Sequence, residues 1–195
     1  MAEATPLYQI RLAVRRELED IAAGETVIVA ASGGADSSAL AAALLPECET
    51  KSIKVVALIV DHALQKNSSD VAHEAKKELA KIGYDNIEIR RIKVEVTDGL
   101  EASARRARYA ALNDVANMHN AVAIFLGHTK DDQAETVLLG LARGSGTRSL
   151  SGMAQRIDQY RRPLLSITRS QTEAACDEIG IKFWRDPHNQ SMEYT

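Results

Sequence analysis

Cysteine is scarce in this sequence, and the two that occur exclude several kinds of site. Cys48 and Cys176 lie far apart and form no Cys-x-x-Cys pair or Cys/His cluster. Zinc sites, iron–sulfur clusters and disulfide frameworks need more cysteines at closer spacing. We therefore expect two buried free thiols, the common state of isolated cysteines, in preference to a catalytic nucleophile.

Long apolar runs are also missing. No window approaches the roughly 20 apolar residues that a membrane span needs, and the first residues, MAEATPLYQIRLAVRREL, carry mixed charge where a secretory signal would be apolar. We expect a cytoplasmic protein that does not bind membranes. Since 45% of the 195 residues are hydrophobic and 26% are charged, the chain has enough apolar material for a packed core.

An excess of basic residues is missing too. The chain has 24 Lys and Arg against 27 Asp and Glu, a net charge of −3, so composition gives no general case for nucleic-acid binding. The charge is unevenly distributed, because residues 101–170 carry 10 basic and 6 acidic side chains. Such a basic segment can mark an anion-binding face, or it can arise by chance.

Short runs rich in β-branched residues alternate with segments of helical periodicity. Four runs predict buried strands, at residues 26–31, 53–60, 87–94 and 121–126. The segments between them predict helices at 38–45, 69–82, 100–118 and 131–142. This alternation is typical of an α/β fold, and we expect a doubly wound, mostly parallel, five-stranded sheet with helices on both faces.

Three further features complete the predicted fold. Thr5-Pro6 starts a first helix that continues at roughly helical spacing towards Gly24, and the second helix is expected to stop before Pro46. Residues 143–152 have no apolar periodicity and predict a loop. Ser170-Gln-Thr-Glu173 reads as a capping box that opens a last helix to Ile179.

The turn after the first strand is a candidate phosphate site, because ligands of such sheets bind beyond the carboxyl ends of the strands. The residues of this turn are Ser32, Gly33, Gly34, Ala35, Asp36 and Ser37. Small residues here expose backbone N–H groups at a helix N-terminus; a tight turn that merely needs small residues is the alternative. Asp36 would repel a phosphate unless a cation bridges them, which indicates a nucleotide with Mg²⁺. The turn is neither a Walker loop nor a GxGxxG fingerprint.

Two other strand ends carry polar groups. Asp61 and His62 follow the second strand, and Gly-His128-Thr-Lys-Asp-Asp132-Gln-Ala-Glu135 follows the fourth. Asp132 and Glu135 are three residues apart, so a helix places both carboxylates on one face near its amino end. This pair could bind a metal or an ammonium group, whereas ordinary capping of the helix by acids is the alternative.

The helix from residue 100 carries three arginines close together. Arg105 and Arg108 share a face, and Arg106 lies about a quarter turn around from Arg105. The planar fork of arginine suits phosphate, although a solvated helix face is the default interpretation of such a run.

These segments together resemble a known family. SGGADS, Val60-Asp61-His62, EASARRARYAAL, GHTKDDQAETVLLGLARGSG, RRPLL and DPHN are similar, in order from about Thr26 to Thr195, to the tRNA(Ile)-lysidine synthetases. These are PP-loop (N-type) ATP pyrophosphatases with an adenine nucleotide alpha hydrolase-like fold. The GHxxDDQAET segment is the more specific signal, since the whole superfamily shares the loop.

The resemblance implies a two-step reaction that needs ATP and Mg²⁺. The C2 oxygen of the wobble cytidine in a CAU-anticodon tRNA(Ile) attacks the α-phosphate of ATP and releases pyrophosphate. The ε-amine of L-lysine then displaces AMP and forms lysidine. A tRNA thiolase of the same superfamily would deliver sulfur instead, which needs cysteine pairs or a cluster. A non-catalytic nucleotide-binding module would leave the acidic pair and the arginines without a role.

The resemblance also implies a role for each candidate residue. Ser32 to Ser37 would hold pyrophosphate, with Asp36 near Mg²⁺, while Asp61 and His62 would line the crevice. Arg105 and Arg106 would bind phosphate or the adenylated cytidine, and His128, Asp132 and Glu135 would form the lysine and reaction pocket. Thr129 departs from the family, which often has a second histidine there.

The resemblance implies one catalytic domain over residues 1–195, with a helix at about 1–25 and an extension at about 153–195. The family usually continues with a basic helix and further tRNA-binding parts, which we expect to be absent after Thr195. The sequence leaves the oligomeric state open, a homodimer included.

Overall fold

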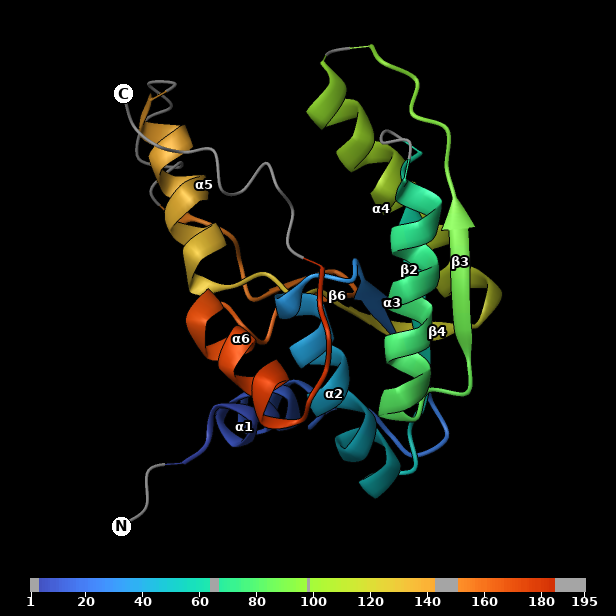
Figure 1. Ribbon diagram of the computed structural model, residues 1–195, viewed down its shortest axis with the longest axis vertical. Helices are drawn as coiled ribbons and strands as arrows, with labels where there is room; N and C mark the ends of the chain where they lie inside the picture. The colour runs from blue at the N-terminus through green and yellow to red at the C-terminus, as the bar shows by residue number, and fades with distance from the viewer. Residues whose placement is uncertain (1–3, 64–66, 98, 143–150, 185–195) are drawn as a thin grey trace.

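The computed structural model describes residues 4–63, 67–97, 99–142 and 151–184. Its helices are α1 (Pro6–Glu17), α2 (Ala35–Thr50), α3 (Ser68–Ile82), α4 (Leu100–Met118), α5 (Lys130–Ala142) and α6 (Arg169–Glu178). Its strands are β1 (Thr26–Ala31), β2 (Lys54–Asp61), β3 (Ile87–Arg91), β4 (Ala121–Phe125), β5 (Arg156–Ile157) and β6 (Tyr160–Arg161). Strands and helices alternate as far as α5, as predicted (Figure 1).

Within the described residues the strands form one sheet, in the order β3-β2-β1-β4-β6-β5. Neighbouring strands are parallel except for β5 and β6, which are antiparallel. The doubly wound, mostly parallel α/β fold is confirmed, with six strands where we predicted five. β5 and β6 have two residues each, which is too short for a hydrophobic period to reveal them.

The strand order places a crevice between β1 and β4. From β1 the chain winds outward to β2 and β3, and it then crosses to β4 on the other side of β1. At such a reversal the connections leave the two strands in opposite directions, so a crevice opens at their carboxyl ends. The turn after Ala31 and the segment after Phe125 meet there.

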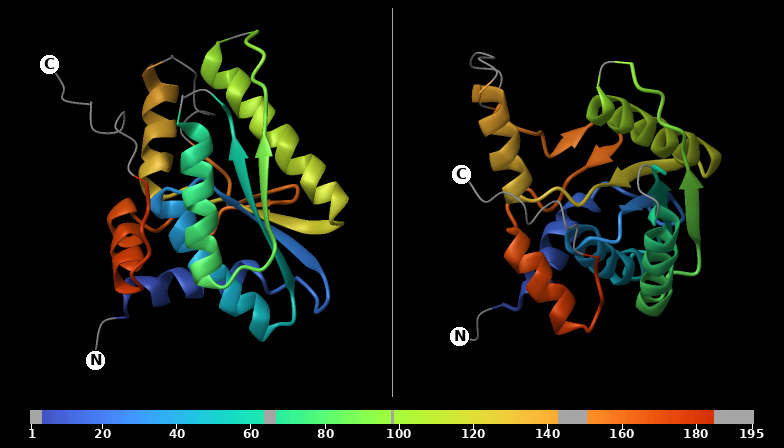
Figure 2. Two further views of the ribbon diagram at one scale, coloured as in Figure 1. Left: turned by 45° about the vertical axis from the view of Figure 1, so that its right-hand side comes forward. Right: turned by 45° about the horizontal axis from the view of Figure 1, so that its top comes forward.

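Alternate residues of β1 point to opposite faces of the sheet. Val27 and Val29 belong to a core cluster with α1, α2, α3 and α6, whereas Ile28 and Ala30 pack with α4 (Figure 2). Burial on both faces explains why this strand has no polar alternation. Cys48 and Cys176 are buried free thiols in the first cluster, as predicted, and burial raises the pKa of each to about 12.

Pro46 does not end α2, contrary to our prediction. Gly34 is the N-cap, so α2 begins at Ala35, and it continues through Pro46 to Thr50. A proline in a helix costs about 3 kcal/mol because it lacks an N–H donor. Here the preceding turns are buried in the core, and the Tyr84 hydroxyl donates a 2.9 Å hydrogen bond to the Ala41 carbonyl. Tertiary packing therefore outweighs the local preference.

Three other predicted boundaries were wrong. The third strand, predicted to reach residue 94, ends at Arg91. α1 ends at Glu17, well before Gly24, because the Leu18 N–H bonds back to the Arg15 carbonyl in a tightened turn. The capping box of α6 is Thr168 with Gln171, two residues before the predicted one; the two residues exchange side-chain to backbone bonds. Of the predicted loop, residues 143–150 lie outside the described part of the chain. No helix in that part combines the length and apolarity of a membrane span.

Candidate functional site

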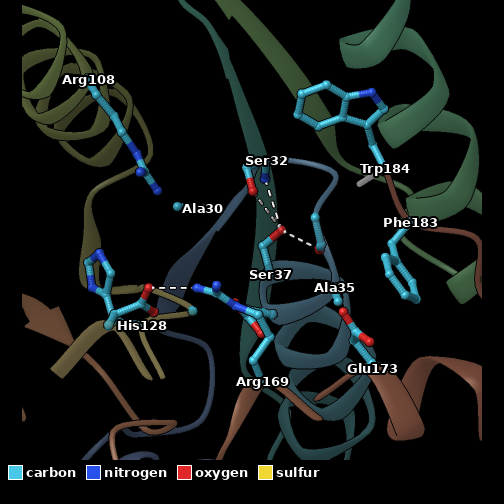
Figure 3. Close-up of a pocket in the computed structure, with 14 residues that line it drawn as sticks. Ala30, Ser32, Ala35, Ser37, Arg108, His128, Arg169, Glu173, Phe183 and Trp184 are labelled. Carbon is cyan, nitrogen blue, oxygen red and sulfur yellow. Dashed lines mark hydrogen bonds and ion pairs between the residues drawn. The ribbon is translucent and has the colours of Figure 1, made fainter. Parts of the chain in front are cut away.

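A cavity of about 540 Å³ opens at the carboxyl ends of β1 and β4. The turn after β1, the first turn of α2, and the segments after β4 and α6 line it, together with side chains of α4, α5 and α6 (Figure 3). Seven predicted site residues face it: Ser32, Gly34, Ala35, Asp36, Ser37, His128 and Asp132. The structure therefore brings together at one crevice more than half of the residues that the sequence singled out.

The turn after β1 is held by one hydroxyl group. Ser37 accepts a 3.1 Å hydrogen bond from the Ser32 backbone N–H, donates one of 3.1 Å to the Gly34 carbonyl, and lies 3.1 Å from the Ser32 hydroxyl. The first N–H groups of a helix have no partner within that helix. In α2 these groups belong to the turn that lines the cavity, so the cavity has the donors and the positive helix end that an anion needs.

Gly127, two residues after the end of β4, lies against this turn. A Cβ atom there would be 3.0 Å from the Ser37 nitrogen and 3.1 Å from the Asp36 carbonyl group. Since real Cβ contacts are essentially never that short with backbone, only glycine lets the two loops approach this closely.

Two carboxylates share one cation in the cavity. Arg169 lies with Nε 3.4 Å from Asp36 Oδ2 and with one terminal nitrogen 2.9 Å from Asp132 Oδ1. The Thr172 hydroxyl also donates to Asp36. Burial raises the pKa of Asp36, and the bonds from Thr172 and Arg169 oppose this shift, whereas the Asp132 charge adds to it.

Asp132 caps α5, one of the two alternatives that the sequence left open, and also forms an ion pair inside the cavity. Its Oδ2 accepts bonds of 2.7 and 2.9 Å from the N–H and hydroxyl of Thr129, so it caps α5. Its Oδ1 points to Arg169 inside the cavity. Glu135, one turn further along α5, is exposed and does not line the cavity.

The carboxylates fit one class of Mg²⁺ site. In the described residues no group of three or more His, Cys, Asp or Glu could hold a metal. Asp36 and Asp132 nevertheless share the cavity, and Mg²⁺ usually takes one or two carboxylates and completes its shell with phosphate oxygens and water. The residues therefore fit an ion that enters with a phosphate ligand, and while Arg169 bridges the two carboxylates they do not fit an ion held by protein alone.

His128 is neutral in this cavity. Burial lowers its pKa to about 4, and the charges of Arg108 and Arg162 act in the same direction. Arg162 Nε lies 3.3 Å from His128 Nδ1. Because a guanidinium group can only donate, Nδ1 accepts and the ring proton is on Nε2. His128 can thus donate a hydrogen bond from Nε2 at neutral pH.

The arginine of α4 that enters the cavity is not one of the two that we predicted. Arg108 lines it, burial lowers its pKa, and no carboxylate of the described residues pairs with it. Arg105 is exposed, with its guanidinium 5.1 Å from the centre of the Tyr109 ring. Arg106 is exposed and donates to Thr97 at 2.6 Å. The shared face of Arg105 and Arg108 was the sequence signal that could have identified Arg108.

Three more predicted residues lie beside the cavity without lining it. Gly33 has φ of +83°, and its carbonyl accepts a 2.8 Å bond from the Trp184 N–H. Asp61 is buried and accepts a 2.9 Å bond from the Ala63 N–H. His62 has a buried Nδ1 with no hydrogen-bond partner among the described residues, and burial and the charge of Arg108 lower its pKa.

Sequence reasoning missed the contribution of the last described elements. Arg169 and Glu173 of α6 line the cavity, as do Phe183 and Trp184 in the segment after it. Trp184 is the single tryptophan of the chain. Figure 3 places the two aromatic side chains on the opposite side of the turn from Arg108 and His128. None of these residues follows a strand, so the rule that found the other loops could not find them.

The chain is similar in sequence to a protein family and to individual proteins over most of its length. It matches the PP-loop domain family over residues 8–195. It is 46% identical to the tRNA(Ile)-lysidine synthase of Thermobifida fusca, over 97% of this chain and 59% of that protein. It is 49% identical to the tRNA(Ile)-lysidine synthase of Streptomyces coelicolor, over 87% of this chain and 49% of that protein. The chain thus spans about half to three fifths of the length of these relatives.

A solved structure shares the fold. The U34-tRNA thiolase NcsA from Methanococcus maripaludis aligns with a TM-score of 0.75, over 93% of this chain and 67% of that one. The sequence identity is 19%, so this likeness concerns the fold alone.

Proposed function

The chain belongs to the PP-loop domain family, and from this membership we propose that it binds ATP in the cavity and uses it to join L-lysine to the wobble cytidine of a CAU-anticodon tRNA(Ile). The product would be lysidine, formed through an adenylated cytidine with release of AMP and pyrophosphate. One observation carries the proposal. The SGGADS turn, the GHTKDDQAET segment and an arginine of α4 meet in one cavity. The names of the two relatives reported above, both tRNA(Ile)-lysidine synthases, support the proposal.

In the first step, the C2 oxygen would form a bond to the α-phosphorus while the bond to the β-phosphate oxygen breaks. The unpaired N–H groups of α2 suit the pyrophosphate that leaves. Arg108 and the Nε2 proton of His128 are the donors available for charge on the α-phosphate. Bound Mg²⁺ would neutralise phosphate charge, and Asp36 would hold it.

In the second step, the neutral ε-amine of lysine would bond to C2 and release one proton to solvent, the C2–O bond would break, and AMP would leave with that oxygen. An ammonium group of the amino acid needs a carboxylate, and Asp132 is the candidate that lines the cavity. Glu135, the other predicted partner, is exposed. We therefore assign the stronger effect on lysine use to Asp132.

Sulfur transfer is the weaker alternative. The thiolase of similar fold carries a [4Fe-4S] cluster, whereas the two cysteines of this chain are separate buried thiols.

Selection of the tRNA would draw on the exposed Arg105 and Arg106, which lie on α4 near the cavity arginine. Phosphate contacts of this kind give binding that weakens as salt increases.

The test is to incubate the protein with ATP, Mg²⁺, labelled L-lysine and CAU-anticodon tRNA(Ile). We expect label in the RNA and, from α-labelled ATP, tRNA-dependent AMP. Methionine tRNA with the same anticodon is the control for selection. ADP as the main tRNA-dependent product would refute the proposed bond cleavage. AMP formation without lysine in the RNA would refute the proposed second substrate.

A further inference from the structure

Arg169 occupies an unusual position for a cation. It is the first residue of α6, after the N-cap Thr168, where the helix dipole is positive and disfavours positive charge. Two carboxylates compensate. Asp36 belongs to the first turn of α2 and Asp132 to the first turn of α5, and the guanidinium group of Arg169 bridges them at 3.4 and 2.9 Å.

The rest of the α6 terminus is fixed to the same two helices. The Arg169 backbone N–H donates a 2.8 Å bond to Asp131 of α5. The Thr172 hydroxyl contacts Asp36 of α2 and the Arg169 carbonyl, the latter at 2.7 Å. These bonds would hold α6 in place if the guanidinium group left the carboxylates. The Arg169 side chain is 41% exposed, so it has room to move within the cavity.

The carboxylates that Arg169 bridges are the same two that the proposed function needs for cationic ligands. Asp36 would hold Mg²⁺, and Asp132 would bind an ammonium group. A guanidinium group and either cation cannot share the space between the two carboxylates without repulsion. The turn of Ser32 to Ser37 lines the same cavity as Arg169, so a phosphate bound at that turn would be an alternative anion for this arginine.

We propose that Arg169 is a positioning residue, the internal counter-ion of the site. Its guanidinium group occupies the space between Asp36 and Asp132 until cationic ligands enter. It then leaves the carboxylates and binds the phosphates of the nucleotide. This inference rests on the proposed function. It predicts that the nucleotide and the cations bind cooperatively, because the nucleotide draws away the arginine that blocks the cations.

Removal of the guanidinium group should therefore change two affinities in opposite directions. In Arg169→Gln the two carboxylates face each other without a cation, so the affinity for Mg²⁺ alone should rise by about tenfold or more. The affinity for ATP should fall by a similar factor, because one phosphate partner is lost. Arg169→Lys keeps the charge without the fork and should lie between the wild type and Arg169→Gln.

The experiment measures binding in the full chain without tRNA or turnover. Calorimetry gives the affinity for MgCl₂ alone, and the fluorescence of Trp184, the single tryptophan, follows ATP binding. Arg156→Gln is the matched control, because Arg156 bridges Glu17 at 2.6 Å and Asp20 at 3.4 Å away from the cavity. It should leave both affinities unchanged.

The outcomes separate this inference from the function on which it rests. A wild type that binds no ATP refutes the proposed function. If the wild type binds ATP but Arg169→Gln and Arg169→Lys bind Mg²⁺ no better, the exchange is refuted. A parallel loss of both affinities would also refute it, since that is the result of a purely structural role. Should Arg169→Gln fail to fold, the Lys variant decides alone.

Discussion

His128 should make the stability of this protein depend on pH in the mildly acidic range. Burial, with help from Arg108 and Arg162, lowers its pKa from 6.5 to about 4 in the folded state. The unfolded chain therefore takes up the proton first. The stabilisation is complete above pH 6.5 and is lost as the pH falls towards 4.

The size of this effect follows from the shift. A change of one pKa unit corresponds to about 1.4 kcal/mol, so at pH 4.5 the free energy of unfolding should be lower than above pH 7 by on the order of 2 to 3 kcal/mol on account of this residue. His128→Asn removes the titratable ring, while its amide oxygen can still accept from Arg162. In this variant, the free energy of unfolding should fall by that amount less between pH 7 and pH 4.5.

The assay is urea unfolding of wild type and variant at pH 7 and pH 4.5. For each protein we take the decrease in the free energy of unfolding between the two pH values, and we compare the two decreases. Contributions from other groups that titrate in both proteins then cancel. His73→Asn is the matched control, since His73 is exposed on α3, and it should behave like the wild type. An equal loss in His128→Asn and wild type would refute the reasoning, because the histidine would then not be held neutral by its surroundings.

Three further substitutions and one control variant test the cavity. Asp132→Asn should weaken lysine use by about tenfold or more, because one charged hydrogen bond to an ammonium group is lost; Glu135→Gln should change it little, and equal effects in a lysine titration would contradict the assignment. Asp36→Asn should slow AMP formation by on the order of a hundredfold, measured with α-labelled ATP, and an unchanged rate would remove Asp36 from the site. Gly127→Ala should lower the free energy of unfolding by about 1 to 3 kcal/mol, since its methyl group would press on the Ser37 nitrogen; an unchanged thermal midpoint would contradict the close approach.

The parts of the site that could be predicted are those that follow strands. The buried strands show in local composition, and polar residues directly after β1 and β4 must lie at one edge of a parallel sheet. The Ser32 to Ser37 turn, His128 and Asp132 were found in this way. Their positions depend on the chain just before them, which the sequence displays.

The parts of the site that the sequence did not reveal depend on contacts between distant segments. Arg169 and Trp184 reach the cavity through the packing of α6, with no strand before them to mark the place. The spacing also could not show that Asp132 lines the cavity and Glu135 does not, because both are predicted on one face of α5. Only the extent of the cavity along that helix distinguishes them. Pro46 stays within α2 for a similar reason, since burial of that helix outweighs the local penalty.

The hydrogen bond from the Trp184 N–H to the Gly33 carbonyl has a consequence for how the protein is made. It ties the turn of Ser32 to Ser37, which we propose binds phosphate, to the last described residue. A contact of such large sequence separation forms late, because a long loop must close first. During synthesis the turn therefore waits for residue 184 to leave the ribosome before it is fully tied in place. We expect a growing chain to bind nucleotide only after residue 184 has emerged.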